Sequence, residues 1–213
     1  MARRFFNPEG FLWKPLGIIG DLVILSLLWC LCSIGLVTLG PATAALYDTV
    51  VHTLRRKEGA SFTRFFETFR RELKEGVLLT LLWAAAALVL GLAVWALLRL
   101  FPALAERGAV VSLIGLLLIF LYFAAASWLF PTLSRFSMGV RAICAACLRL
   151  AAGYALRSAA IALITLSVIA ASARFAAPIM IAPALAAYLC SFLIEPVFRR
   201  FEEDAAAGSR EEE

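Results

Sequence analysis

Five long stretches of this chain contain no charged residue, and they limit its fold more than any other feature. The stretches are Leu22–Tyr47, Gly76–Leu98, Gly108–Ser134, Ser158–Ala173 and Phe175–Ile194. Most of them reach the roughly 20 apolar residues that a helix needs to cross about 30 Å of hydrocarbon. A water-soluble domain of 213 residues has one buried core rather than five such runs. The chain is therefore predicted to be a membrane protein.

The composition supports this class, because 63% of the residues are hydrophobic and only 16% are charged. Ordinary soluble domains are about 45–50% apolar and about 25% charged. The backbone in a bilayer must satisfy its own hydrogen bonds, and the alternating pattern of a β-barrel is absent. We expect an all-α integral membrane protein with about five transmembrane helices, within a range of four to six. The expected spans lie near residues 16–38, 76–101, 109–131, 158–173 and 175–198, with Ala177-Pro178 and Ala182-Pro183 kinking the last.

The first of two amphipathic segments lies between the first and second expected spans. Its apolar side chains recur at helical spacing: Phe62, Phe65, Phe66, Phe69 and Leu73. The other faces carry Arg64, Glu67, Arg70, Arg71 and Lys74. An apolar stripe opposite a basic face is typical of a helix in the membrane interface. A helix packed on the cytoplasmic side of the protein itself would show the same pattern, and the two interpretations are equally supported.

The second amphipathic segment, Pro131–Arg157, contains four arginines and no acid: Arg135, Arg141, Arg149 and Arg157. No Asp or Glu occurs between Arg107 and Ile194. Phosphates of anionic lipid headgroups are the simplest partners for such arginines. The alternative is that acids distant in sequence approach them in the fold, for which the candidates are Glu67, Glu72, Glu75 and Glu195.

The Lys and Arg residues cluster in Asp48–Glu75, in Arg135–Arg157 and after Glu195. The positive-inside rule places these segments and the C-terminus in the cytoplasm. A short additional membrane element at Ala42–Leu54 would place the N-terminus in the cytoplasm too. The side of the membrane on which the N-terminus lies stays undecided. Residues 1–200 are expected to form one membrane domain with a hint of two related halves, since Pro41 and Pro131 precede the two basic segments. The acidic residues 201–213 are expected to be a disordered tail.

No catalytic or phosphate-binding motif occurs in the sequence. Its only histidine, His52, lies four residues after Asp48, which predicts a local hydrogen bond. Cys144 and Cys147 form a C-x-x-C without two further zinc ligands nearby, so we expect no metal and no cofactor. The candidate intramembrane charges are Asp21 and Glu195, each of which has either a structural or a transport role. Asp21 is the stronger functional candidate, since Ser26, Ser33 and Thr38 follow it.

The most distinctive segment runs from Thr38 to Tyr47. Gly40-Pro41 is expected to break the first helix and form a corner, after which small residues allow close helix approach. Such a corner suits a ligand or a partner helix, although a purely structural corner has the same sequence. The candidate residues of this corner are Thr38, Gly40, Pro41, Ala42, Thr43, Ala44, Ala45 and Tyr47.

Three motifs in the first half resemble the YesL-like family of bacterial membrane proteins, whose function is unknown. They are Asp21-Leu-Val-Ile-Leu-Ser-Leu-Leu-Trp29, Thr38-x-Gly40-Pro41-Ala42-Thr43-Ala44-Ala45-Leu46-Tyr47 and Phe65-Phe66-x-x-Phe69. Pro131-x-x-x-Arg135-Phe136 fits the second half, whereas Ser26 and Gly35 replace a usual asparagine and proline. The resemblance implies an inner-membrane protein, often encoded beside ATP-driven sugar transporters, and assigns no catalytic residue.

Three functions remain open on this basis. The first is a non-enzymatic accessory or regulatory protein that assembles with subunits of a carbohydrate transporter. The second is a small-solute transporter or channel that acts as an oligomer of this chain. The third, which has the least support, is a membrane enzyme acting on lipid or lipid-linked sugar. None of the three involves a nucleic acid.

Overall fold

The structure of the protein is a computed structural model that describes residues 13–55, 61–100, 108–136, 138–174 and 181–211. Helices make up nearly all of these residues, and no strand occurs among them. The predicted all-α class is therefore confirmed. The helices are α1 (Trp13–Cys32), the 3-10 turn η2 (Leu36–Thr38), α2 (Leu39–Thr49), the π-helical η3 (Val50–Arg55), α3 (Ser61–Arg71), α4 (Leu73–Leu100), α6 (Gly108–Arg135), α7 (Val140–Gly153), α8 (Ala155–Arg174) and α9 (Ala182–Glu211).

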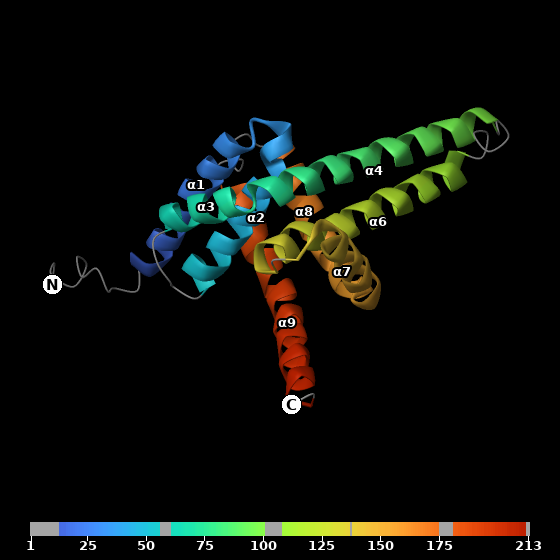
Figure 1. Cartoon of the computed structure of the whole chain (residues 1–213). Helices are drawn as coiled ribbons and strands as arrows, with labels where there is room; N and C mark the ends of the chain where they lie inside the picture. Colours follow the sequence, from blue (N-terminus) through green and yellow to red (C-terminus); the bar gives the residue numbers. More distant parts are fainter. Residues whose placement is uncertain (1–12, 56–60, 101–107, 137, 175–180, 212–213) are drawn as a thin grey trace.

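Four of the described helices are long and apolar enough to cross a membrane, and they make this a multi-pass membrane protein. The candidate spans are Leu73–Ala96, Leu113–Arg135, Ala155–Ser172 and Ala182–Phe201. A shorter apolar helix covers Gly17–Cys32. In Figure 1, α4 and α6 lie side by side and extend well beyond the other helices. Leucines such as Leu88, Leu92 and Leu116 are exposed on this hairpin, as expected for side chains that face lipid.

The chain begins with a second helical hairpin, in which α1 runs in one direction and α2 with η3 returns beside it (Figure 1). The indole Nε1 of Trp29 donates to the Thr43 hydroxyl at 3.1 Å across this hairpin. Leu25, Val50 and Phe65 are fully buried in the apolar cluster that joins α1, α2, η3 and α3. Together, α2 and η3 span the short element that the sequence allows at Ala42–Leu54.

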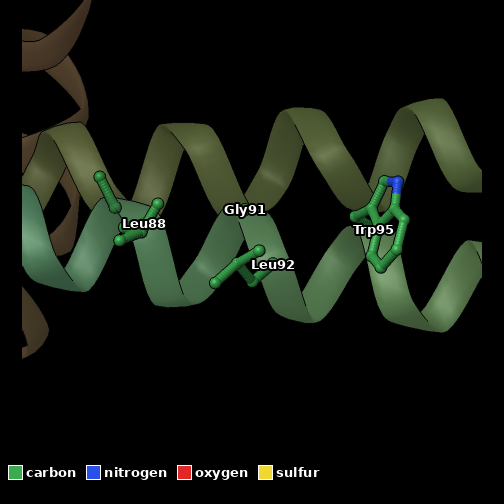
Figure 2. Close-up of a pocket in the computed structure, with 5 residues that line it drawn as sticks. Leu88, Gly91, Leu92 and Trp95 are labelled. Carbon is green, nitrogen blue, oxygen red and sulfur yellow. The ribbon is translucent and has the colours of Figure 1, made fainter.

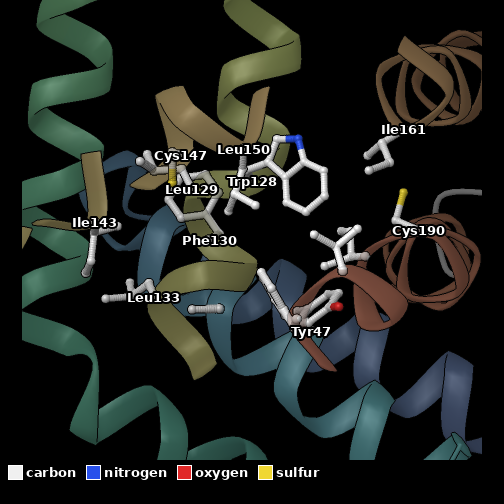
Figure 3. Packing of buried hydrophobic residues seen from close by; sticks show 14 of the residues in the cluster. Tyr47, Trp128, Leu129, Phe130, Leu133, Ile143, Cys147, Leu150, Ile161 and Cys190 are labelled. Atoms are coloured by element: carbon white, nitrogen blue, oxygen red, sulfur yellow. The ribbon is translucent and has the colours of Figure 1, made fainter. Parts of the chain in front are cut away.

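The larger apolar core joins α2 to α6, α7, α8 and α9 (Figure 3). Trp128 of α6 is completely buried in it, and its ring packs edge-on against Phe198 of α9 at 6.1 Å between centroids. The Trp128 indole also donates to the Ser158 hydroxyl of α8 at 2.7 Å, so its only polar atom is satisfied. Leu79 of α4 also belongs to this core, which therefore holds parts of all four candidate spans together.

The contact between α2 and α4 depends on two glycines that face each other. A Cβ atom on Gly40 would meet the Thr80 side chain, the Gly76 carbonyl oxygen at 2.5 Å and the Phe130 ring at 2.9 Å. A Cβ atom on Gly76 would meet the ring of Pro41 at 2.8 Å. Only glycine at both positions lets the two backbones come this close.

The position of the first helix break differs from the prediction. The first helix ends at Cys32, and Gly40-Pro41 lies in the first turn of α2 instead of at a corner. A proline costs little there, because the first backbone N–H groups of a helix have no partner within the helix. The turn is closed by Thr38, whose hydroxyl donates to the carbonyl oxygens of Cys32 and Gly35, each at 2.6 Å.

Two other prolines also have positions that the sequence pattern misjudged. Pro183 is the second residue of α9, so it starts this helix rather than kinking it, whereas Pro178 lies outside the described residues. Pro131 does not end its span, because α6 continues through it to Arg135. The surrounding core buries Pro131, and this packing retains the last turn despite the missing N–H.

The C-terminal residues are helical to Glu211, and the expected disorder of residues 201–213 stays a prediction. Residues 202–211 consist mainly of alanine, glutamate and arginine, which have high helix propensity. They continue a helix that is already nucleated and anchored by the packing of Val197 and Phe198. The expected relation between two halves of the chain stays a prediction.

Replacing Gly40 with alanine tests the close contact between α2 and α4. We expect G40A to destabilise the protein in detergent by about 1–3 kcal/mol, because the added methyl group overpacks the contact. G91A is the matched control, since a Cβ on Gly91 meets nothing within 4 Å. It removes the same type of residue from a helix and should leave the melting temperature unchanged or raised. Equal melting temperatures of the two variants would contradict the packing described here.

Candidate functional site

Polar and charged side chains converge on the last turn of α2 and on η3. Asp48 is 4% exposed and accepts hydrogen bonds from two side chains of α3. The Thr68 hydroxyl donates to Oδ2 at 2.8 Å, and Nε of Arg64 donates to the same oxygen at 3.0 Å. His52 Nδ1 lies 3.1 Å from Oδ1 and 2.9 Å from the Asp48 carbonyl oxygen. Asp48 thus joins η3 and α3 through one buried carboxylate.

This cluster forms because two pairs of residues with a spacing of four meet face to face. Asp48 and His52 share one face of the α2–η3 helix, and Arg64 and Thr68 share one face of α3. The predicted contact between Asp48 and His52 is confirmed. The contribution of α3 was missed, although the four-residue spacing of Arg64 and Thr68 was a usable signal.

A second cluster of charged and polar side chains lies on the side of α2 that faces α9. It includes Tyr47, the residue before Asp48 in the sequence. Glu195 is buried and forms an ion pair with Arg135 of α6, with 3.4 Å between Oε2 and Nη2. Arg135 is therefore held by a protein carboxylate, and the alternative that Glu195 approaches an arginine of Pro131–Arg157 is confirmed. The expected contact of Arg135 with lipid phosphates stays a prediction.

Tyr47 and Arg55 complete the second cluster. The Tyr47 hydroxyl is buried and makes no hydrogen bond to the described residues. Burial, followed by the Glu195 carboxylate, raises the pKa of Tyr47 well above its usual value, and the charges of Arg135 and Arg55 oppose this shift. Nη1 of Arg55 donates to the Ser191 carbonyl oxygen at 2.6 Å, and the guanidinium lies 4.6 Å from the centroid of the Phe192 ring.

A pocket opens beside the second cluster, between η3 and the end of the α9 span. Its volume is about 400 Å³, and its lining is Val51, Arg55, Glu195, Pro196 and Arg199. Arg199 is exposed and lies one helical turn after Glu195. Two cationic side chains and one buried carboxylate therefore face the same space, which can hold a small polar molecule.

A hollow of different character lies on α4 and is purely apolar. Its volume is about 460 Å³, and Leu88, Gly91, Leu92 and Trp95 line it together with Ala87. In Figure 2 these side chains are arranged along α4, with α6 behind. The lining offers no charged group, so this surface suits a lipid chain or an apolar helix face rather than a polar ligand.

Most of the predicted corner residues lie inside the protein. Gly40, Pro41, Ala42, Ala44, Ala45 and Tyr47 are buried, whereas Thr38 and Thr43 are half-buried. Thr43 accepts the bond from Trp29 and donates to the Leu39 carbonyl oxygen at 2.7 Å. The alanines of α2 thus provide close packing among helices of the same chain, and Tyr47 alone brings a polar group to the second cluster.

The remaining candidate charges have separate environments. Asp21 of α1 is half-buried and accepts a hydrogen bond from the Ser61 hydroxyl at 3.0 Å, which ties the start of α3 to α1. Arg141 and Arg149 are exposed on α7. The Arg157 guanidinium lies 5.6 Å from the centroid of the Tyr154 ring. The structure therefore brings Glu195 and Arg135 together but leaves Asp21 and the other three arginines apart from them.

The C-x-x-C motif does not build a metal site in the part of the chain that the structure describes. No group of three or more His, Cys, Asp or Glu side chains occurs there with the geometry to hold a metal ion. Burial raises the pKa of the Cys147 thiol to about 11, against the smaller lowering effect of the Thr132 side chain nearby. This cysteine is therefore a neutral thiol within the apolar core at neutral pH.

Comparison with known proteins gives one match. A family model described as "Protein of unknown function, DUF624" matches residues 22–105, which is less than half of the chain. The matched region contains α2, η3 and α3, and therefore Tyr47, Asp48 and Arg55. No curated protein and no solved structure matches the chain.

Replacing Asp48 with asparagine tests the first cluster. The neutral amide removes the carboxylate that Arg64 pairs with, and its own N–H groups can come to lie near the donor groups of Arg64 and Thr68. We expect D48N to destabilise the protein by about 2–4 kcal/mol, near the usual cost of breaking a buried ion pair. E67Q removes an exposed carboxylate from α3 and should change stability by about 0.5 kcal/mol or less. Urea unfolding in mild detergent measures both, and similar midpoints for the two variants would contradict the role given to Asp48.

A double-mutant cycle tests the ion pair between Arg135 and Glu195. We expect R135Q and E195Q each to lower stability, because each leaves one buried charge without its partner. The double variant should be less destabilised than the sum of the two by about 0.5–3 kcal/mol. Thermal unfolding of the four proteins gives this coupling energy. Additive effects would show that the two side chains do not interact.

Proposed function

We propose that this chain is a non-enzymatic accessory protein of the bacterial cytoplasmic membrane that assembles with other membrane subunits. The observation that carries the proposal is the exposure of the α4–α6 hairpin. Within the protein, 11% of the α4 span and 22% of the α6 span is buried, compared with 18% of the shorter α8 span and 44% of the α9 span. A long apolar hairpin that hardly packs against its own chain offers a surface to helices of another subunit.

The orientation of the protein follows from the same helices. An even number of candidate spans separates α3 from α7 and from the end of α9, so these three basic segments lie on one side of the membrane. The positive-inside rule assigns that side to the cytoplasm. Both charge clusters and the pocket between η3 and α9 then lie near the cytoplasmic surface.

The link to carbohydrate uptake rests on resemblance. The residues that resemble the YesL-like proteins in the first half, from Asp21 to Phe69, lie almost entirely within the region matched by the family model. Proteins of that kind are often encoded beside ATP-driven sugar transporters, which makes transporter subunits the partners to test first.

Affinity purification in mild detergent tests the assembly. We expect the tagged protein, isolated from cells that grow on the relevant sugar, to recover transporter subunits that an untagged strain does not give. Trp95→Ala on the exposed face of α4 should reduce the recovery, because it removes an aromatic side chain that is 59% exposed. Leu163→Ala, at an exposed apolar position of α8, serves as the control and should leave it unchanged. Recovery of no transporter subunit would overturn the proposal.

A small-solute transporter or channel remains a second candidate, and the polar pocket beside Glu195 favours it. In that case the protein reconstituted into liposomes moves a solute, and E195Q impairs the movement more than Asp21→Asn does. The hydrogen bond that Asp21 accepts from Ser61 supports a structural role for Asp21, and its functional role stays a prediction.

A further inference from the structure

The pocket between η3 and α9 combines two cationic side chains with one buried carboxylate at its surface. We propose that it binds a phosphate monoester or diester whose organic part carries free hydroxyl groups. Arg55 and Arg199 bind the phosphate, and Glu195 accepts a hydrogen bond from a hydroxyl group. The inference does not depend on the accessory role proposed above.

Arg55 is positioned in advance for an anion. Its Nη1 donates a hydrogen bond to the Ser191 carbonyl oxygen at 2.6 Å, and its guanidinium lies over the ring of Phe192. These two contacts fix the guanidinium, and among the described residues only its Nη1 is seen to donate, although one guanidinium carries five donors. A planar, fixed guanidinium binds phosphate oxygens with good geometry and little loss of side-chain entropy.

Arg199 supplies the second charge from the opposite wall. It lies four residues after Glu195 on α9, so both side chains lie on the same helix face. Arg200, the next residue, is also exposed but does not line the pocket. Of these two neighbouring arginines, only Arg199 adds its charge to that of Arg55 at the pocket.

Glu195 determines which anions fit. Its carboxylate is an acceptor only, so it repels a bare phosphate but accepts a hydrogen bond from a hydroxyl group. The ion pair with Arg135 fixes the position of this buried carboxylate. A ligand with a phosphate and a nearby hydroxyl places its anionic oxygens at the arginines and its hydroxyl at the carboxylate at the same time. Inorganic phosphate can donate from its own P–OH group only by bringing its negative charge close to the Glu195 carboxylate.

Tyr47 lies beside this cluster but does not line the pocket. Its buried hydroxyl makes no hydrogen bond to the described residues, and the charges of Glu195, Arg135 and Arg55 act on it. A ligand in the pocket therefore contacts Arg55, Arg199 and Glu195 rather than Tyr47.

The position and size of the pocket restrict the source of the phosphate. Glu195, Pro196 and Arg199 belong to the last two turns of the α9 candidate span, so the pocket lies at the membrane boundary. About 400 Å³ holds one headgroup or one small phosphate ester. Phosphatidylglycerol supplies a phosphate with glycerol hydroxyls from the membrane, and glycerol 3-phosphate supplies the same chemistry from solution.

Binding measurements on the full-length protein test the inference. Isothermal titration in detergent measures glycerol 3-phosphate and inorganic phosphate, and native mass spectrometry measures retention of phosphatidylglycerol relative to phosphatidylcholine. We expect the wild type to bind glycerol 3-phosphate at least tenfold more tightly than inorganic phosphate, or to retain phosphatidylglycerol selectively. The first result identifies a soluble ester as the ligand, and the second identifies a lipid headgroup.

Two arginine variants separate a defined site from general basic charge. R199A should weaken the binding of whichever ligand is found at least tenfold, while R200A, which removes the same charge one residue away, should leave it within twofold. Both positions are exposed, so neither substitution threatens the fold. Equal effects of R199A and R200A overturn the inference, as does the absence of both glycerol 3-phosphate binding and selective lipid retention. Equal affinity for inorganic phosphate overturns the role given to Glu195.

Discussion

The burial of α2 along nearly its whole length is the constraint on which the rest of the structure depends. This short helix contacts α1, α3, α4, α6 and α9, so its side chains set the distance to five neighbours. Gly40 and the alanines of α2 keep those distances small, and Gly76 of α4 packs against the Gly40-Pro41 turn of α2. Lipid gives apolar helices no hydrophobic reason to associate, so close packing of this kind and buried polar contacts must hold the bundle together.

The end of α2 shows how the two kinds of contact are combined. Tyr47 faces α9 and the ion pair between Arg135 and Glu195, whereas Asp48 faces α3 and binds Arg64 and Thr68. Asp48 therefore attaches α3 to α2 by polar contacts, whereas Tyr47 packs beside the ion pair that joins α6 to α9. A buried charge without a partner is costly, so these contacts fix the register of α3 and α9 more narrowly than apolar packing does. The pocket beside Arg55 and Arg199 opens where the second of these attachments reaches the membrane boundary.

The apolar spans and the amphipathic helices could be predicted from the sequence because each depends on local periodicity. Charge-free runs identify α4, α6, α8 and α9, and the phenylalanine stripe identifies α3. The break after Cys32 could not be placed, since Gly40-Pro41 is the stronger breaking signal but proline is harmless in a first helical turn. The charge clusters depend on tertiary packing: Arg135 and Glu195 are sixty residues apart, and sequence alone offered Glu195 only as one of several acids.

Hydrogen–deuterium exchange of the detergent-solubilised protein tests the central role of α2 most directly. Amides exchange slowly where opening requires disruption of the whole packed core, and quickly where a helix opens on its own. If α2 organises the bundle, peptides covering residues 42–50 exchange more slowly than peptides covering residues 62–71 of α3, although both helices have eleven residues. Exchange in α2 that is as fast as in α3 would contradict the account.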